Sequence, residues 1–251
     1  MPATWIDLAG AHNARDLGGL TAGGGRTRPG VLLRSDALDA LTAEDVEALV
    51  EERGVAHVVD LRSAHERLQR GRGLLGATPV RYTELEVIGP DDLARRADAR
   101  ARAFASGSPP ARVLGDGYVE LLDIGAGAFA EAFRRIVEPG GAPVLVHCAI
   151  GKDRTGVLIA LLLDAAGVDR DEIVADYARS GERMAPIIER WRSADATINE
   201  QLAAFSTMAP AETMVQVLDH LCERWGGAAG FLADHDVPRR AVETWRQQLV
   251  A

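Results

Sequence analysis

Cysteine, lysine and long apolar runs are all scarce in this sequence. The two cysteines are Cys148 and Cys222, and a chain of 251 residues can build a core without a disulfide, so both thiols are expected to be free. No apolar run approaches the roughly 18–20 residues that span a bilayer, which excludes an integral membrane segment. The N-terminal residues lack the basic start and apolar core of a signal peptide, so we expect a cytoplasmic protein.

Acidic residues outnumber basic ones. The formal net charge is −9, from 28 basic and 37 acidic side chains, and an acidic chain of this kind is a poor binder of nucleic acid. Lysine occurs once, at Lys152, and the other basic side chains are arginines. The histidines and cysteines do not have the spacing of a zinc site, so the sequence predicts neither a metal nor a cofactor. Nothing in it indicates an oligomeric state.

The apolar runs predict one α/β domain over residues 1–251. Buried strands are expected at 31–33, 55–61, 77–82 and 143–146. Helices are expected at 42–53, 91–104, 126–137 and 155–166, with a loop at 105–112. Because strand–loop–helix units alternate along the chain, we expect a central, largely parallel sheet flanked by helices. From residue 179 onward the chain has a helical character.

Three local patterns add detail to these helices. Thr42 with Asp45, and Asp169 with Glu172, have the spacing of capping boxes at helix starts. Cys222 lies among apolar residues at helical spacing, which predicts a buried core thiol.

The segment from Val144 to Gly156 predicts a chemical site. An apolar strand runs into a loop at 147–154, and the loop runs into a helix. The backbone N–H groups of such a loop converge at the positive end of the helix dipole, which makes an anion site of about phosphate size. The expected phosphate-binding residues are Ala149, Ile150, Gly151, Lys152, Asp153, Arg154 and Thr155.

Cys148 lies near the start of this loop and Arg154 lies at its end, and phosphoryl chemistry uses both residue types. A thiolate is a nucleophile, and helix N-termini and neighbouring cations favour the thiolate form of a cysteine. The planar guanidinium of Arg154 can grip two phosphoryl oxygens. The Thr155 hydroxyl is expected to hydrogen-bond the sulfur, and His147 to hold Cys148 in place.

The run His147-Cys148-x-x-Gly151-Lys152-Asp153-Arg154-Thr155-Gly156 resembles the signature loop of cysteine-dependent protein tyrosine phosphatases. More narrowly, it is similar to the bacterial group typified by mycobacterial tyrosine phosphatase B. Further matches lie at 13–19, 34–36, 60–66, 167–180 and 226–232. The similarity is weakest from about 83 to 117. Ala14 replaces an aromatic residue, and Ile150 replaces an alanine, that are usual in the group.

The resemblance implies a phosphomonoester hydrolase that acts on phosphotyrosine in proteins or peptides, with dual specificity as an extension. Cys148 would be the nucleophile that forms a phosphocysteine, and Arg154 would bind the phosphoryl group. Asp153 and Asp60 are both candidates for the general acid, and the pattern of the group favours Asp153. Asp60 could instead orient Arg154 or pair locally with Arg62. The supporting residues expected around the site are His147, Arg62, Arg15, Asp16 and Asp36.

Two alternatives stay open. Lys152 also resembles the lysine of phosphatases that accept phosphoinositides, where it adds charge for a multiply phosphorylated ring, although it could equally be solvated. A phospho-ligand binding module without turnover is the hypothesis from a different class, but no catalytic group is missing.

Two further segments have less specific patterns. Arginines cluster in the weakly matched segment at 95, 96, 100, 102 and 112, and nearby aspartates favour a solvated helix face over an anion-recognising patch. Residues 179–214 are a candidate helical lid. Their apolar face, formed by Met184, Ile187, Ile188 and Trp191, suits a lid or plain core equally.

Overall fold

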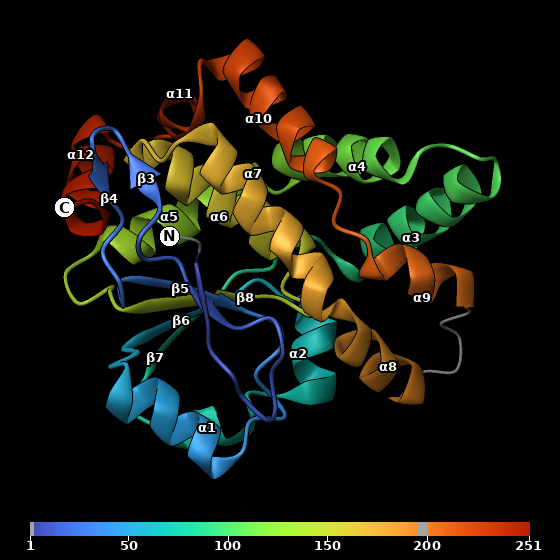
Figure 1. Cartoon of the computed structure of the whole chain (residues 1–251), viewed down its shortest axis with the longest axis horizontal. Coiled ribbons are helices and arrows are strands. Elements are labelled where there is room, and N and C mark those ends of the chain that lie inside the picture. The colour runs from blue at the N-terminus through green and yellow to red at the C-terminus, as the bar shows by residue number, and fades with distance from the viewer. Residues whose placement is uncertain (1–2, 195–199) are drawn as a thin grey trace.

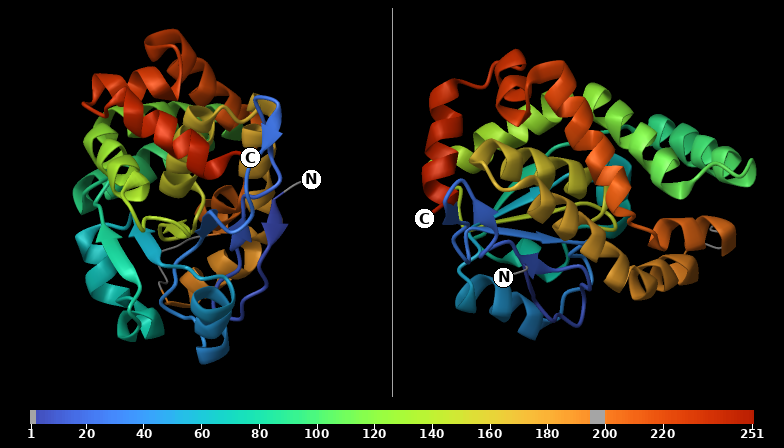
Figure 2. Two further views of the ribbon diagram at one scale, coloured as in Figure 1. Left: turned by 90° about the vertical axis from the view of Figure 1, so that its left-hand side faces the viewer. Right: turned by 45° about the horizontal axis from the view of Figure 1, so that its top comes forward.

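A six-stranded sheet forms the centre of the computed structural model, which describes residues 3–194 and 200–251 (Figures 1 and 2). In spatial order its strands are β1 Thr4–Trp5, β2 Arg15–Asp16, β5 Leu32–Ser35, β8 Val144–His147, β6 His57–Asp60 and β7 Arg81–Glu84. The last four run parallel, and the two N-terminal strands are antiparallel. The expected largely parallel sheet is therefore confirmed.

Strands β5, β6 and β8 lie at the predicted positions because their residues are buried on both faces. The fourth predicted strand is shifted: residues 73–77 form a 3-10 turn, and β7 begins at Arg81. The register pairs His147 with both Ser35 and Asp60, so the carboxyl ends of three parallel strands meet at one edge. This edge is where a parallel α/β sheet places its ligand site.

Helices cover both faces of the sheet. On one face lie α4 Pro110–Ile124, α5 Ala126–Val137, α6 Asp153–Ala166, α7 Arg170–Arg179, α10 Ala211–Trp225, α11 Ala228–Asp234 and α12 Arg239–Leu249. The opposite face is covered by α1 Ala43–Glu47 and the π-helical turn Ala48–Glu52. Neighbouring strand residues such as Val144 and Leu145 belong to the separate cores on these two faces.

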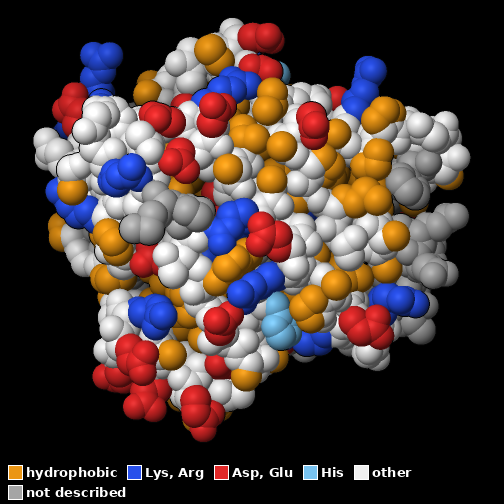
Figure 3. Space-filling model, viewed as in Figure 1, with side chains coloured by type: hydrophobic (Ala, Val, Ile, Leu, Met, Phe, Trp, Pro, Cys, Tyr) orange, Lys and Arg blue, Asp and Glu red, His pale blue; other side chains and the backbone are white. Residues whose placement is uncertain are grey.

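The remaining helices gather at the end of the sheet where β8 runs into α6 (Figure 1). They are α2 Ala64–Arg70, α3 Pro90–Ala105, α8 Met184–Ala194 and α9 Glu200–Thr207, with a 3-10 turn at Ser180–Arg183 before α8. On the face seen in Figure 3, acidic and basic side chains are interspersed. Among the described residues, no helix is both long and apolar enough to cross a membrane.

One predicted capping box is present and the other is wrong. The Thr42 side chain accepts a hydrogen bond from the Asp45 amide, and Asp45 accepts one from the Thr42 amide. Asp169 precedes α7 but its side chain does not cap it. Glu172 instead accepts hydrogen bonds from the amide and hydroxyl of Thr21, in the hairpin of β3 Thr21–Ala22 and β4 Gly25–Arg26. Tertiary contact with this hairpin replaces the local cap.

Two other expectations need correction. The loop predicted at 105–112 is shorter, because Pro110 already starts α4, where a proline costs no hydrogen bond. Cys222 is exposed rather than buried. Leu221 and Leu218 face the core from α10, and the next residue along the helix is turned about 100° away from Leu221.

Candidate active site

The loop between β8 and α6 forms an open cradle of backbone amides. Among the described residues, none of the amides of residues 149–154 donates to a protein acceptor. Gly151 has a φ of +68°, and a Cβ placed on it would lie 2.4 Å from the Ser35 carbonyl oxygen. Only glycine allows this turn and this close approach to β5. The free amides at the start of α6 make a binding site for an anion.

The floor of the cradle is fixed by buried hydrogen bonds. The carbonyl of Gly151 accepts from Asn13 Nδ2 at 3.0 Å and from Arg34 Nη2 at 2.8 Å. Asp176 on α7 joins Arg34 at 2.6 Å and Arg15 at 2.7 Å, with all three side chains buried. Arg15 thus supports the loop indirectly, through Asp176 and Arg34. Arg34 is a supporting residue that sequence reasoning did not single out.

Asp36 fixes the N-terminal segment that carries Asn13. Its carboxylate accepts the amides of His12 and Asn13, both at 2.8 Å. Its other oxygen lies 3.2 Å from Arg190 on α8. Burial raises the pKa of Asp36, although these amides and Arg190 act in the opposite direction. Asp36 therefore links α8 to the floor of the cradle.

Arg154 is held by a carboxylate on α2. Its Nη1 and Nη2 lie 2.6 Å and 2.8 Å from the two carboxylate oxygens of Glu66. Glu66 also accepts the Ser63 amide at 2.7 Å in the capping box of α2, so its position is set by the helix start. Burial would raise the pKa of Glu66, but Arg154 and Ser63 lower it below its usual value. Glu66, and not Asp60, orients Arg154.

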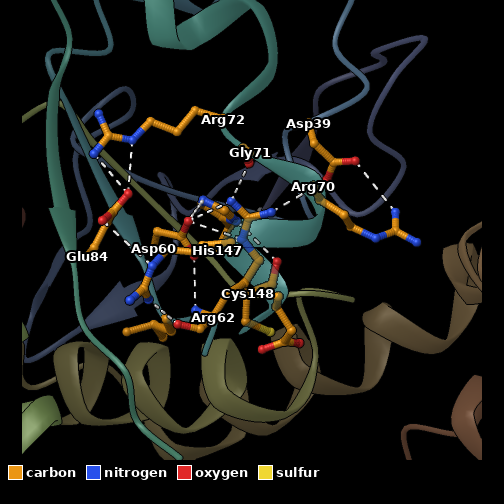
Figure 4. A network of polar contacts seen from close by, with 12 residues as sticks. Asp39, Asp60, Arg62, Arg70, Gly71, Arg72, Glu84, His147 and Cys148 are labelled. Atoms are coloured by element: carbon orange, nitrogen blue, oxygen red, sulfur yellow. Dashed lines mark hydrogen bonds and ion pairs between the residues drawn. The ribbon is translucent and has the colours of Figure 1, made fainter. Parts of the chain in front are cut away.

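Asp60 lies beneath the loop, fully buried (Figure 4). Its carboxylate forms a fork with Arg62, with Oδ2 2.7 Å from Nη2. His147 Nε2 is 3.7 Å from the same oxygen, and His147 Nδ1 lies 3.1 Å from the Cys148 carbonyl. Burial would raise the pKa of Asp60, but His147 and Arg62 lower it to about 2. The local pairing with Arg62, one of the expected alternatives, is the one present.

A cavity of about 180 Å³ opens over the loop. Its charged lining residues are Glu66, Arg96, Arg100, Asp153 and Arg154. Its other lining residues are Ile88, Leu93, Ala97, Leu121, Ala149, Ile150 and Trp191. Cys148 is buried directly before Ala149. An apolar wall beside an anion cradle suits an aromatic ring that carries a phosphate.

The comparisons with known proteins decide the family. The model of the tyrosine phosphatase family matches residues 6–251. The chain belongs to this family. It is 27% identical over 276 residues to the triple specificity protein phosphatase PtpB of Mycobacterium tuberculosis, with 97% of this chain and 98% of that protein covered. It is 38% identical over 181 residues to a putative tyrosine-protein phosphatase of Cupriavidus necator, with 69% and 62% covered.

Among solved structures, TpbA of P. aeruginosa in complex with pTyr is 16% identical, with a TM-score of 0.35. That match covers 86% of this chain and 93% of the other. The match of the family model over residues 6–251 makes the protein a phosphatase, and the expected family is confirmed.

Asp153 reaches the phosphatase cavity from the start of α6. Its Oδ1 lies 3.2 Å from Arg100 Nη1, and its side chain is 16% exposed. Burial would raise the pKa of Asp153, but Lys152, Arg100 and a hydrogen bond from Tyr118 lower it below its usual value. Tyr118 in turn accepts a hydrogen bond from Tyr177 at 3.1 Å. Of the two candidate acids, Asp153 lines the cavity.

Lys152 is neither solvated nor directed at this cavity. It is buried, and its ammonium donates to the carbonyls of Ser206 at 2.7 Å and Met208 at 2.9 Å. Burial lowers the pKa of Lys152. These contacts tie the loop to the last turn of α9 and to the connection that follows it, inside the predicted lid segment.

Two expected contacts are not formed in this phosphatase. Thr155 Oγ1 is buried without a hydrogen-bond partner among the described residues, so the expected bond to sulfur is absent. Asp16 accepts the amides of Gly18 and Gly30, at 2.9 Å and 2.7 Å, and shapes a turn away from the cavity. Within the described ranges, no group of three His, Cys, Asp or Glu side chains could hold a metal ion.

The arginine cluster, which lies on α3 except for Arg112 on α4, divides between two environments. Arg95 and Arg112 are exposed, as expected for a solvated face. Arg96 and Arg100 instead line the cavity, because they lie one turn apart on the face of α3 that packs toward α4. For these two residues the expectation was wrong. The sequence signal that could have revealed them is their i, i+4 spacing.

In the predicted lid, Met184, Ile187 and Ile188 are core residues. Trp191, the fourth residue of that face, lines the cavity and stacks under the guanidinium of Arg70 at 4.3 Å. The same apolar face therefore supplies both core and cavity wall.

Proposed function

We propose that this phosphatase hydrolyses phosphotyrosine in proteins or peptides through a phosphocysteine at Cys148. The observation that carries the proposal is the cradle of free amides between Cys148 and Arg154, placed beside an apolar cavity. The free thiol suits the reducing cytoplasm, where we infer that the protein acts.

In the first step, Cys148 Sγ attacks phosphorus and the bond from phosphorus to the tyrosine oxygen breaks. The loop amides and Arg154 stabilise the charge on the equatorial phosphoryl oxygens. Arg154 enters this step already oriented, since both of its terminal nitrogens are fixed by Glu66. A protonated Asp153 donates its proton to the leaving oxygen, which departs as the neutral phenol.

In the second step, a water molecule attacks the phosphocysteine. Asp153, now a carboxylate, takes a proton from this water as the new phosphorus–oxygen bond forms and the sulfur–phosphorus bond breaks. Phosphate leaves and Cys148 returns to its starting state. The two steps use the same loop and no redox change.

Asp153 is the proposed general acid because it lines the cavity beside Arg154. Asp60 is fully buried and its oxygens are occupied by Arg62, so we assign it a supporting role. It holds His147, whose other nitrogen contacts the Cys148 carbonyl. The proposed supporting set is then Glu66, His147, Arg62, Asp60, Arg15, Arg34, Asp176, Asn13 and Asp36.

The phosphoinositide alternative depended on Lys152, and the contacts of its ammonium with Ser206 and Met208 leave it no direction toward the cavity. A phosphotyrosine ring also suits the apolar wall of Ile88, Leu93 and Trp191 better than a polar inositol ring. We therefore propose a phosphotyrosine peptide, ahead of a phosphoinositide, as the substrate.

The test compares phosphotyrosine, phosphoserine and phosphoinositide substrates side by side, for the wild type, Cys148→Ser and Asp153→Asn. We expect phosphotyrosine to be turned over fastest and Cys148→Ser to be inactive. We expect Asp153→Asn to lower kcat by about 10²–10³. Bound phosphate analogues without any turnover would instead establish a binding module, and unchanged kcat in Asp153→Asn would reject Asp153 as the acid.

A further inference from the structure

Three arginines line the substrate cavity, and among them Arg100 is the one with a buried nitrogen that has no hydrogen-bond partner in the described part of the chain. Both terminal nitrogens of Arg154 are bound to Glu66. Arg96 donates to Glu120 at 2.5 Å and to the Gly117 carbonyl. Arg100 has its ion pair with Asp153 at 3.2 Å, while its buried Nε has no hydrogen-bond partner among the described residues.

We propose that Arg100 binds a second anionic group of the substrate, a carboxylate or phosphate next to the phosphotyrosine, and that this contact releases Asp153 for catalysis. The inference rests on the proposed function and names the substrate class of the same site: acidic phosphotyrosine peptides. Arg100 is then a specificity-determining residue supplied by α3.

The space around Arg100 allows a peptide to extend past the phosphorylated residue. Arg96 and Arg100 also line a second cavity of about 270 Å³, between α3 and α4. The substrate cavity and this second one therefore adjoin along the α3 arginines. A guanidinium at their junction can form a forked pair with a carboxylate or phosphate while the aromatic ring stays over the loop.

The pair between Arg100 and Asp153 couples binding to acid catalysis. A general acid must carry a proton, and a cation 3.2 Å away favours the carboxylate form instead. The charged and titratable groups that face Asp153 are Lys152, Arg154, Arg96, Arg100, Tyr118 and Tyr177. Lys152, Arg154 and Arg96 are held by other partners. Arg100 has a nitrogen without a partner, so a second anion of the substrate, beside the phosphoryl group on Arg154, could compensate its charge and raise the pKa of Asp153 toward its ordinary value.

The apolar wall favours a peptide over a lipid headgroup as the bearer of this anion. Leu93, Leu121 and Trp191 face the ring that carries the phosphoester, whereas an inositol ring would leave its hydroxyl groups unpaired there.

The experiment measures kcat/KM for two phosphotyrosine peptides that differ in the residues flanking the phosphotyrosine, glutamate in one and glutamine in the other. The wild type should prefer the glutamate peptide by about tenfold. Arg100→Met should reduce this ratio to about twofold or less, and Arg100→Lys should restore part of it. The matched control is Arg102→Met, on an exposed residue of the same helix, and it should keep the wild-type ratio.

A second readout is the pH profile. With the glutamine peptide, Arg100→Met should shift the alkaline limb of the kcat profile to higher pH, because the cation that favours the Asp153 carboxylate is gone. A merely structural role for Arg100 would lower kcat without moving that limb, and this result would overturn the proposal.

Equal preference for the two peptides in the wild type, or the same ratio in Arg100→Met, would also overturn it. A bisphosphorylated inositol lipid turned over faster than either peptide, with this advantage lost in Arg100→Met, would overturn the peptide as the substrate. Failure of the proposed function is read separately, by peptide binding to Cys148→Ser and to Cys148→Ser with Arg100→Met. An Arg100-dependent preference in binding without wild-type turnover would uphold the anion site and reject the phosphatase mechanism.

Discussion

The two sides of the loop between β8 and α6 are held in different ways. On the side of β5, the loop carbonyl of Gly151 is fixed by Asn13 and Arg34, and Asp176 fixes Arg34 in turn. On the side of α3 and α9, the loop is held by the pair of Arg100 with Asp153 and by the contact of Lys152 with two backbone carbonyls.

The side of β5, here called the inner side, uses residues from the segments that resemble the family most, and its charged side chains form buried ion pairs. The side of α3 uses a residue from the segment that resembles the family least. We infer that the inner side fixes the geometry that phosphoryl transfer requires, while the outer side is where substrate preference can change without loss of the reaction.

The largest effect should come from breaking the inner side. Asp176→Asn leaves the charges of Arg15 and Arg34 buried with no carboxylate between them. We expect the free energy of unfolding to fall by about 3–5 kcal/mol, measured by urea denaturation. The matched control is Asp219→Asn, whose partner Arg170 is exposed, and it should cost less than about 1 kcal/mol. Equal losses would contradict the structural importance assigned to the buried contacts of Asp176.

The substitution Glu66→Gln tests whether the carboxylate of Glu66 on α2 positions Arg154. Glutamine keeps the size of the side chain but removes the charge that fixes both terminal nitrogens of Arg154. We expect kcat/KM for a phosphotyrosine peptide to fall about 10–100-fold, since transition-state contacts lose their alignment. Glu138→Gln, on the far end of α5, serves as the control. A loss of stability without a loss of kcat/KM would reject the positioning role.

The contacts of Asp60 with His147 and Arg62 should make stability depend on pH in the acid range. The folded pKa of Asp60 is about 2, below the ordinary 3.8. A depressed pKa stabilises the fold above the ordinary value, and that stabilisation, about 2 kcal/mol, is lost as pH falls through the folded value. Denaturation at a series of acid pH values should show a shallower slope in Asp60→Asn. The same slope as in the wild type would disprove the assignment.

The smallest effect should come from the outer contact of Lys152. Lys152→Met keeps the packing of the stem and removes two hydrogen bonds, to Ser206 and Met208. We expect a loss of about 1–2 kcal/mol in the free energy of unfolding. A loss as large as that of Asp176→Asn would show that the two sides of the loop are equally important for the fold.

The loop and its sheet could be predicted from the sequence because their signals are local. An apolar strand, Cys148 and Arg154 at fixed spacing, and Gly151 at the turn all lie within one short segment. The approach of α2 and α3 to this segment is tertiary. The contacts of Glu66 with Arg154 and of Arg100 with Asp153 join residues distant in the chain, and no spacing rule predicts them.

The errors have a similar cause. Glu172 has the spacing of a capping box, but the hairpin that carries Thr21 lies within its reach and takes its carboxylate. Helical spacing alone placed Cys222 with its apolar neighbours, although the edge of a buried face is decided by what packs on α10. Charge around Arg100 suggested solvation, but α4 packs over that face of α3.

The buried ammonium of Lys152 offers a chemical probe of local opening of the fold. Because lysine occurs once in the chain, an amine-acylating reagent has a single ε-amine to modify. That amine reacts only after its contacts with the carbonyls of Ser206 and Met208 are broken. The rate at which Lys152 is acylated therefore reports how often the end of α9 and its connection to α10 open. Phosphate analogues that bind the adjacent loop can be compared by how much each one lowers the acylation rate of Lys152.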